Sequence, residues 1–376
     1  MARKQFTLRK PLLIIGVLIL AAVVMSACGS GSVLQGSSWP GMTLEDGILY
    51  VANEEFVYAI SEENGSEIWR YPDPEKSDRN TTFFAPPAIA SEDLIIVGSY
   101  DTKTYALQPT GRFAAVLWTF EAEEERERDR IIGGPVVDED TVYIPGSNWN
   151  LYARNLEDGG PGPWTKPFRG EEAFWSAPLI VGERIYASSL DQHLYALELD
   201  SGRMIWSKDL GGAITDTPTL AGKALLSGTF AQSLFALNLE SGNEVWSFQA
   251  DGGIWGSPAV SDSMAFFGDD AGFAYALDFT SGSLLWKEQL EGPVRASPIV
   301  INEVVYFVTE FGVVQALDTS TGNSLWPGLN AIDGRLLSDP IASEGGLLVG
   351  AMESDCMVFI LDYESGFSRC FFATEE

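Results

Sequence analysis

Short apolar runs recur along this chain and are separated by small polar turns. Val304–Val308 is a run of β-branched and aromatic residues, and Leu194–Leu197 combines leucines with a tyrosine. Turns rich in Gly and acidic residues, such as residues 181–184, lie between these runs. Such runs bounded by turn residues are typical of β-strands. No segment after the N-terminal stretch keeps a helical period, so the body of the chain is predicted to be all-β.

One segment with these features repeats about every forty residues. ALDFTSGSLLW occupies residues 276–286, and ALNLESGNEVW occupies residues 236–246. Related segments occupy residues 59–69, 106–118, 153–164, 196–206, 316–326 and 360–370. Two of these, 106–118 and 153–164, carry insertions before the Trp, and the last ends in Cys370 instead of Trp. A fixed period of this length is the signature of a repeat architecture.

Each period also opens with a proline and contains four predicted strands. The prolines are Pro40, Pro87, Pro135, Pro178, Pro218, Pro258, Pro298 and Pro340. Four short strands per period of this length predict one blade of a β-propeller. A single blade cannot bury both faces, whereas blades stacked around an axis bury them against each other. We therefore predict an eight-bladed β-propeller of four-stranded antiparallel blades over residues 39–376.

The repeated Trp is predicted to dock each blade on its neighbour. The Gly of each turn supplies the positive φ that a tight hairpin needs, and the Ala ten residues before the Trp leaves room for the ring. A buried aromatic side chain removes roughly 150–250 Å² from water. The docking residues would be Trp69, Trp118, Trp164, Trp206, Trp246, Trp286 and Trp326.

The pattern Ala-x-Asp-x-x-Thr-Gly-x-x-x-Trp resembles the tryptophan-docking motif of the pyrroloquinoline quinone (PQQ)-like β-propeller family. The resemblance covers the chain from about Trp39 to Phe372. One branch of that family is the quinoprotein dehydrogenases, which bind PQQ and calcium. The other is the BamB-like lipoproteins, which are non-enzymatic propellers that assist outer-membrane protein assembly. A shared fold does not decide between these functions.

The first residues read as an export signal. Arg3, Lys4, Arg9 and Lys10 form a positive region, residues 11–24 are apolar, and small residues lead to Cys28. We predict a lipoprotein signal peptide at 1–27, a lipidated Cys28 and a flexible tether at 28–38. An uncleaved membrane anchor is the alternative. The apolar run is short for a membrane span and ends in a Cys followed by Gly and Ser, which favours the lipoprotein.

The chain is strongly acidic. The predicted signal carries four of the 23 basic residues and none of the 53 acidic ones, so the remainder has a net charge of −34. Such a surface disfavours nucleic acid and anionic lipid headgroups. It suits basic partners or divalent cations, although solvated acidic loops are the simpler interpretation.

Two cysteines remain after Cys28, and both lie in the last repeat. In an oxidising exported compartment, a disulfide between Cys356 and Cys370 would stabilise the terminal blade. An unbroken hairpin register would instead place Cys370 opposite Ile360, which leaves free thiols as the alternative.

The sequence offers no clear catalytic centre. The single histidine, His193, falls where the repeat has a turn, and the count of His and Cys excludes an ordinary zinc site. The acidic clusters at 138–140 and 269–270 do not match a calcium loop and sit at turns, where Asp is favoured for backbone reasons. The adjacent-cysteine pair and the calcium ligands that the dehydrogenase branch would imply have no counterpart. We predict no catalytic residue, no metal and no cofactor, with PQQ and calcium as the alternative.

Positions three residues before each repeated proline are predicted to ring one face near the propeller axis. They are Phe84, Ile132, Trp175, Thr215, Trp255, Arg295 and Leu337, with Asp216 and Asp339 in the same loops. Trp and Arg are enriched at interface hot spots, so Trp175, Trp255, Arg295 and Asp216 form the candidate binding face. The alternatives are that these residues plug the channel, or that a partner strand adds to an outer strand of a blade.

The sequence therefore predicts an exported, lipid-anchored, monomeric propeller that binds protein partners of the cell envelope without catalysis and without nucleic acid. The resemblance implies a BamB-like role. The alternative functions are a quinoprotein-type dehydrogenase, or a degenerate propeller that binds or senses a small molecule.

Overall fold

The computed structural model describes residues 40–75, 81–122, 131, 133–326 and 330–374. The predicted signal peptide, the tether, Cys28, Trp39 and Ile132 lie outside these residues. Every regular element in the described part of the chain is a β-strand. No helix in that part is long and apolar enough to cross a membrane.

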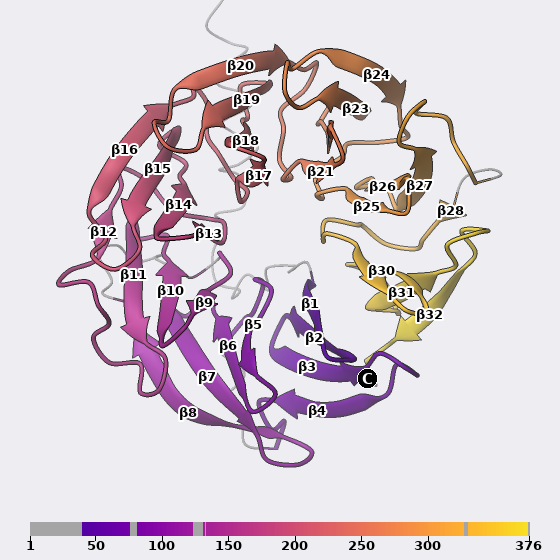
Figure 1. The fold of residues 1–376 in the computed structure, drawn as a ribbon. Coiled ribbons are helices and arrows are strands. Elements are labelled where there is room, and N and C mark those ends of the chain that lie inside the picture. The colour runs from indigo at the N-terminus through magenta and orange to yellow at the C-terminus, as the bar shows by residue number, and fades with distance from the viewer. Residues whose placement is uncertain (1–39, 76–80, 123–130, 132, 327–329, 375–376) are drawn as a thin grey trace, which may run out of the picture. The chain divides into compact units, whose positions relative to one another are not determined.

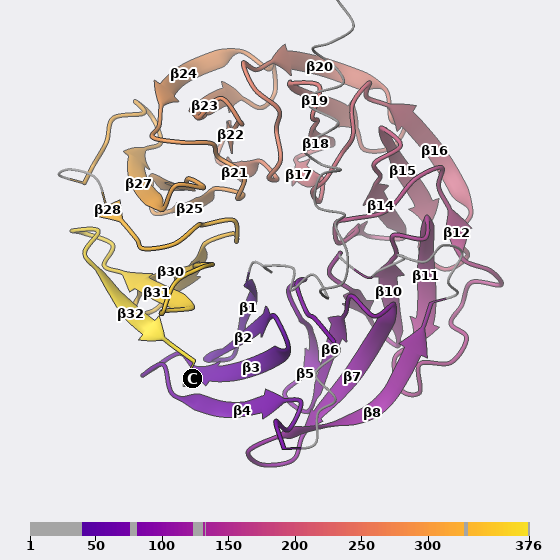
Figure 2. The same ribbon diagram turned by 180° about the vertical axis from the view of Figure 1, so that it is seen from behind.

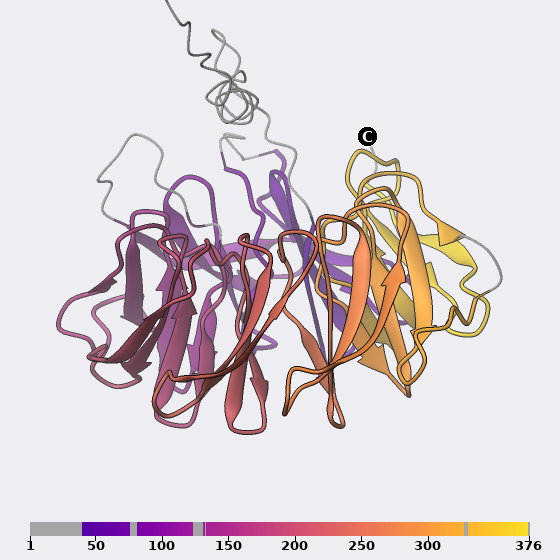
Figure 3. The same ribbon diagram turned by 90° about the horizontal axis from the view of Figure 1, so that it is seen from above.

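The strands form eight four-stranded antiparallel sheets, and each sheet is built from four consecutive strands. The sheets are arranged as blades around a central axis, numbered here 1 to 8 in chain order, as Figure 1 shows from one side and Figure 2 from the other. Seen from the edge of the ring, the strands run across its thickness and the turns gather at its two ends (Figure 3). The prediction of an eight-bladed, all-β propeller is confirmed.

Each blade has an inner, a second, a third and an outer strand. The inner strands are β1 (Gly41–Glu45), β5 (Ala88–Ser91), β9 (Val136–Asp138), β13 (Leu179–Val181), β17 (Thr219–Ala221), β21 (Ala259–Ser261), β25 (Ile299–Ile301) and β29 (Ile341–Ser343). The second strands are β2 (Ile48–Asn53), β6 (Leu94–Gly98), β10 (Thr141–Pro145), β14 (Arg184–Ser188), β18 (Ala224–Gly228), β22 (Met264–Gly268), β26 (Val304–Val308) and β30 (Gly346–Gly350).

The third and outer strands complete the blades. The third strands are β3 (Phe56–Ser61), β7 (Lys103–Pro109), β11 (Asn150–Asn155), β15 (His193–Glu198), β19 (Ser233–Asn238), β23 (Phe273–Asp278), β27 (Val313–Asp318) and β31 (Val358–Leu361). The outer strands are β4 (Glu67–Tyr71), β8 (Ala114–Glu121), β12 (Phe168–Arg169), β16 (Met204–Asp209), β20 (Glu244–Gln249), β24 (Leu284–Gln289), β28 (Asn330–Ala331) and β32 (Ser368–Phe372).

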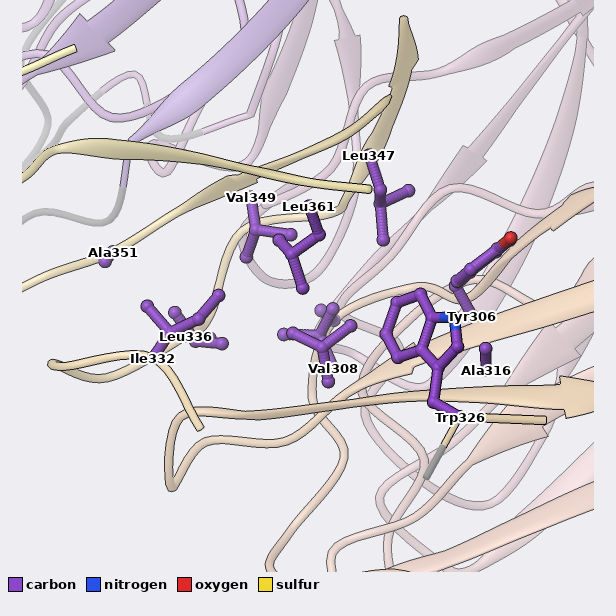
Figure 4. Packing of buried hydrophobic residues seen from close by; sticks show 12 residues of the cluster. Tyr306, Val308, Ala316, Trp326, Ile332, Leu336, Leu347, Val349, Ala351 and Leu361 are labelled. Atoms are coloured by element: carbon purple, nitrogen blue, oxygen red, sulfur yellow. The ribbon is translucent and has the colours of Figure 1, made fainter. Parts of the chain in front are cut away.

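The hydrophobic core is divided into clusters that lie between neighbouring blades. The second and third strands are buried along most of their length, on both faces of the sheet. In the cluster of Figure 4, Tyr306 and Val308 of blade 7 pack with Leu347 and Leu361 of blade 8. A strand buried on both faces needs apolar residues at successive positions, which explains the continuous apolar runs in the sequence.

The ring closes between the last blade and the first. Blade 8, at the C-terminal end, lies beside blade 1, at the N-terminal end (Figures 1 and 2). Phe372 of β32 packs edge-on against Tyr58 of β3, with ring centroids 5.3 Å apart. The backbone N–H of Glu344 donates to Oε1 of Glu62 at 2.8 Å. The C-terminal residues supply the outer strand of blade 8, β32.

The indole of each docking Trp reaches the following blade. The Nε1–H of Trp286 donates to the carbonyl of Thr319 at 2.8 Å. Trp118, Trp164, Trp246 and Trp326 make the equivalent bond at 2.8–3.0 Å. Within the third and outer strands, Ala276 pairs with Trp286, followed by a register shift. Each of these bonds ties one blade to the next.

Two docking residues depart from this arrangement. Trp206 is half-buried, and its Nε1 has no hydrogen-bond partner in the described structure. The carbonyl in the equivalent place, that of Leu239, accepts from the hydroxyl of Tyr186 at 3.1 Å. Trp69 packs with Ile95 and Val97 of blade 2, but a Cβ on Gly111 in the last turn of that blade would meet nothing within 4 Å, so the indole does not lie against this glycine.

Two outer strands are shorter than the repeat suggested. In blades 3 and 7, Trp164 and Trp326 lie before the outer strand rather than within it. Trp164 follows Pro163, and Trp326 is followed by Pro327. Proline has no N–H to donate to the ladder, so Pro163 interrupts strand pairing before Trp164. Both indoles nevertheless keep their hydrogen bonds to the next blade.

Cys356 and Cys370 are joined by a disulfide, with their Cα atoms 5.7 Å apart. The register shifts between Val358 and Phe359, so Cys370 lies opposite Phe359. The unbroken register, which placed Ile360 there, was wrong. The shift moves Cys370 one position closer to Cys356, which lies just before β31.

Candidate functional site

A cavity of about 590 Å³ lies at the end of the central channel where the inner strands begin. All eight blades contribute to its wall, which includes Met42, Pro86, Gly134, Trp175, Asp216, Trp255, Arg295 and Leu337. We call it the channel-mouth cavity. Its position follows from the repeat, because each chain segment that enters an inner strand passes the same end of the ring. The loops that converge there differ in sequence, whereas the strands that carry them are alike.

Trp255 and Arg295 of the wall form one compact group with Asp270. The Nε1–H of Trp255 donates to Oδ2 of Asp270 at 2.6 Å, and Nε of Arg295 donates to Oδ1 at 3.0 Å. The guanidinium of Arg295 lies over the indole of Trp255, 4.9 Å from its ring centroid. Both side chains are therefore held in one orientation by a single carboxylate.

Ion pairs extend from this group around the ring. Arg295 also pairs with Glu310, at 3.0 Å between Nη1 and Oε2. Glu310 in turn pairs with Arg335, and Arg335 lies 3.7 Å from Glu353. The chain of charges thus crosses blades 6, 7 and 8. Arg295 is shared between two carboxylates, so its positive charge is already neutralised by the protein.

Asp216 and Asp339 face the cavity from blades 5 and 8 and converge on Ser297 of blade 7. Oδ2 of Asp216 accepts from the hydroxyl of Ser297 at 3.1 Å and from the N–H of Ser257 at 2.8 Å. Oδ1 of Asp339 accepts from the N–H of Ser297 at 2.6 Å. No ion pair to either carboxylate is found within the described ranges of the chain.

The surroundings of these two carboxyl groups disfavour their charged forms. Asp339 is open to the cavity but ringed by protein, and this loss of bulk water raises its pKa to about 7, with the negative charge of Asp216 adding to the effect. Burial also raises the pKa of Asp216, against hydrogen bonds from Thr217, Ser257 and Ser297 that lower it. Each carboxylate would be stabilised by a cation in the cavity.

Most positions in the predicted ring line the cavity. Trp175, Thr215, Trp255, Arg295 and Leu337 do so, and Trp175 keeps 38% of its surface exposed. The prediction was wrong for Phe84, which is 3% exposed and packs on Tyr100 with ring centroids 4.1 Å apart. Ala85 and Pro86 take its place in the wall. Phe84 does not line the cavity because its ring packs against Tyr100 instead of entering the channel.

The sequence reasoning missed Asp270 and Glu310 as partners of Arg295. Both lie in the loop between the second and third strands of their blades, and Phe230 holds the same position in blade 5. The ring of Phe230 packs on Trp255, with centroids 4.4 Å apart. An alignment of the repeats at this loop would have shown that these positions vary as strongly as those before the prolines.

In one of the acidic clusters considered for calcium, Asp269 and Asp270 have hydrogen-bond partners within the protein. Asp269 is fully buried, and it accepts from the N–H groups of Gly252 and Phe273 and from the hydroxyl of Tyr275 at 2.8–2.9 Å. His193 begins β15 and contacts Asp191. In the described ranges, no three His, Cys, Asp or Glu side chains are grouped to hold a metal.

The wall of the channel-mouth cavity does not fit PQQ. The three carboxylates of PQQ require cationic partners, but Arg295 already pairs with Asp270 and Glu310. Asp216 and Asp339 would add negative charge beside an anionic ligand. The family resemblance therefore accounts for the fold and not for a quinone site in this cavity.

The outer strands expose apolar side chains beside the docking Trp residues. Val245 of β20 is 54% exposed and Leu285 of β24 is 50% exposed, each next to a buried Trp. An outer strand also has a free edge, which suits strand addition by a partner. Neither residue belongs to the wall of the channel-mouth cavity.

Comparison with known proteins agrees with this architecture. No curated protein sequence matches the chain. The crystal structure of BamB from Moraxella catarrhalis is similar, with a TM-score of 0.67 and 16% identity over 82% of this chain and 90% of that one.

Two further solved structures share the fold. Quinohemoprotein alcohol dehydrogenase from Comamonas testosteroni has a TM-score of 0.66 and 16% identity, over 84% of this chain and 71% of that one. The computationally designed Ika8 protein has a TM-score of 0.69 and 11% identity, over 87% and 97%. At such identities these likenesses show the fold alone.

A family model extends the comparison to the sequence. The model described as outer membrane protein assembly factor BamB matches residues 23–248 and 230–369. These matches include nearly every repeat, from the first blade to the last. The chain therefore belongs to the family of the outer membrane protein assembly factor BamB.

Proposed function

We propose that this protein is an exported, lipid-anchored and non-catalytic scaffold that binds a protein partner of the cell envelope. The partner binds on the channel-mouth face, by which we mean the end of the ring that holds the channel-mouth cavity and the loops around it. Membership in the BamB family supports an envelope role. The export signal and Cys28 in the sequence support the anchor. The role is then to hold a partner at the membrane surface rather than to transform a substrate.

The exposed aromatic side chains of the channel-mouth face are the observation that carries this proposal. Trp175 is 38% exposed, Phe230 36% and Phe311 69%. Phe311 lies in the β26–β27 loop, at the same end of its blade as the start of β25. Large aromatic residues beside arginine are the composition of binding hot spots.

Site-specific photo-cross-linking in cells tests the binding face. A photoreactive phenylalanine analogue replaces Trp175 in one strain and Glu183 in another. Glu183 is exposed in the β13–β14 turn, at the opposite end of the same blade. We expect the Trp175 position, and not the Glu183 position, to cross-link a component of the β-barrel assembly machinery identified by mass spectrometry. Equal products from both positions would contradict the proposal.

The anchor is tested separately. Mass spectrometry of the mature N-terminus is expected to find a lipidated Cys28, and the variant Cys28→Ser is expected to leave the membrane fraction. An intact N-terminus in the wild-type protein would show instead that the first residues remain as an anchor.

The absence of quinone-dependent catalysis is tested with PQQ and calcium. Added together, they are expected to leave the melting temperature of the purified protein unchanged, because the cavity wall holds no free cation for the cofactor carboxylates. A rise of several degrees would favour the dehydrogenase branch of the fold.

A further inference from the structure

The channel-mouth cavity combines aromatic walls with two carboxyl groups that lack a cation. Asp216 and Asp339 accept hydrogen bonds only from backbone N–H groups and a hydroxyl in the described structure. The one arginine in the wall, Arg295, is shared between Asp270 and Glu310. The cavity interior is therefore acidic, and among the described residues no cationic side chain pairs with either carboxyl group.

The carboxyl group of Asp339 has acceptor sites that the protein does not fill. In the described structure its only hydrogen-bond partner is Ser297, and the residue is exposed at the cavity. A carboxylate offers about four acceptor sites on its two oxygens, and ammonium and guanidinium groups carry several N–H donors. A ligand with such a group could therefore donate hydrogen bonds to Asp339.

The shape and the apolar part of the wall restrict the ligand further. A volume of about 590 Å³ falls within the range of roughly 300–1,000 Å³ that is usual for sites of small ligands. Trp175, which is 38% exposed, offers an indole face, and such a face attracts organic cations through its ring electrons. Prolines and Leu337 line the rest of the wall and suit an apolar carbon chain.

Other ligand classes fit less well. An anion would meet two carboxylates and an arginine that is already paired. A bare metal ion prefers three or more oxygen, nitrogen or sulfur ligands, and no such group occurs in the described ranges. An organic cation satisfies the two carboxylates and the exposed indole of Trp175 together.

We propose that the channel-mouth cavity binds a cationic group, an ammonium or guanidinium flanked by apolar carbon, with Asp216 and Asp339 as its counter-ions. This site goes beyond the scaffold function, because it concerns the isolated protein and needs no envelope partner. The cation can be a free small molecule or the basic side chain of a polypeptide, since the chemistry is the same.

Calorimetric titration of the purified full-length protein tests the site with matched charged and neutral probes. Butylguanidinium is compared with butylurea, and the peptide acetyl-Leu-Arg-Leu-amide with the same peptide carrying citrulline in place of arginine. Citrulline keeps the shape of arginine without its charge. We expect each charged probe to bind at least ten times more tightly than its neutral counterpart. Equal affinities would overturn the proposal, and this comparison uses only the wild-type protein.

The carboxyl groups are tested by the double variant Asp216→Asn, Asp339→Asn. Its matched control is Glu183→Gln, Asp200→Asn, which removes the same charge from exposed turns at the other end of blade 4. We expect the first pair of substitutions to weaken charged-probe binding at least tenfold and the control pair to leave it unchanged. Equal weakening by both pairs would show a non-specific charge effect and overturn the assignment.

Two further measurements identify the source of the cation and the groups that bind it. A peptide that binds at least ten times more tightly than butylguanidinium indicates a polypeptide side chain, and similar affinities indicate a free small molecule.

Titrations near pH 7 in two buffers of different ionisation enthalpy are expected to show proton release on binding, because a cation lowers the pKa of Asp339. Binding without proton release would place the cation away from this carboxyl. A failure of all probes to bind would leave the cross-linking result for the envelope scaffold unaffected, so the two proposals fail separately.

Discussion

The indole of Trp246 in blade 5 lies directly against Gly282 in the turn of blade 6, so closely that a Cβ on Gly282 would stand 2.6 Å from Cδ2 of the ring. The same relationship recurs along the chain. It pairs Trp118 with Gly159, Trp164 with Gly202, Trp206 with Gly242, Trp286 with Gly322 and Trp326 with Gly366. The turn glycine therefore does two things. It adopts the positive φ that the turn needs, and it leaves space for the indole of the previous blade to pack against it.

Gly282→Ala is expected to destabilise the protein more than Gly211→Ala. Both glycines have φ of +72°, but a Cβ on Gly211 would meet nothing within 4 Å. The backbone strain is thus the same in both variants, and only Gly282→Ala pushes against an indole. Overpacking of this kind costs about 1–3 kcal/mol. Urea unfolding of the two variants measures the difference, and equal losses would show that the indole contact is not tight.

Trp286→Phe is expected to cost more stability than Trp206→Phe. Each substitution replaces an indole at the same position of its repeat. Of the two indoles, only that of Trp286 donates a hydrogen bond to the next blade. The difference should be about 1 kcal/mol, the usual net value of one hydrogen bond. Thermal and urea unfolding of both variants provide the measurement. A larger loss for Trp206→Phe would mean that packing outweighs the hydrogen bond.

Reduction of the Cys356–Cys370 disulfide is expected to destabilise the wild-type protein. The bond closes a loop with a sequence separation of 14, and closing such a loop stabilises a fold by about 3 kcal/mol. Reductant should lower the unfolding midpoint of the wild-type protein and leave that of the variant Cys356→Ser, Cys370→Ser unchanged. Mass spectrometry with and without reductant supplies the thiol count, and two free thiols in the exported protein would contradict the bond.

The stability of the protein is expected to fall between about pH 4 and pH 7 because of Asp339. Its folded pKa is raised to about 7, above the value of about 3.9 for an unfolded chain. The folded state then keeps a proton that the unfolded state has lost, so rising pH favours unfolding through this window. Asp339→Asn should flatten this part of the profile, whereas Asp200→Asn, at an exposed turn, should not. An unchanged slope in Asp339→Asn would place the pKa of this carboxyl near its ordinary value.

The repeat made it possible to predict the fold from the sequence. Trp286 and Gly282 recur at the same interval in several blades, and a spacing of about forty residues that contains four turn-bounded runs leaves few alternatives to a propeller. The departures occur where a local feature interrupts the repeat. Pro163 ends the pairing around Trp164, and a bulge after Val358 shifts the register that Cys370 follows.

The candidate site was only partly visible in the sequence. Trp175, Trp255 and Arg295 could be picked out because they occupy a position at which the residue type differs from one repeat to the next. Their partners could not be predicted, because Asp270 and Glu310 come from different loops of the repeat and meet Arg295 only in three dimensions. Asp339 was noted beside the ring, yet its relation to Ser297 and Asp216 spans three blades.

The sequence by itself determined the blade, its number of strands, its copy number and the residues that join one blade to the next, because these are local patterns repeated at a fixed interval. The tertiary structure decided what faces the channel. Closing the ring brings Asp216 and Asp339, 123 positions apart in the chain, into one cavity with the indoles of Trp175 and Trp255. No local pattern encodes that meeting, because it depends on the curvature accumulated over all eight blades.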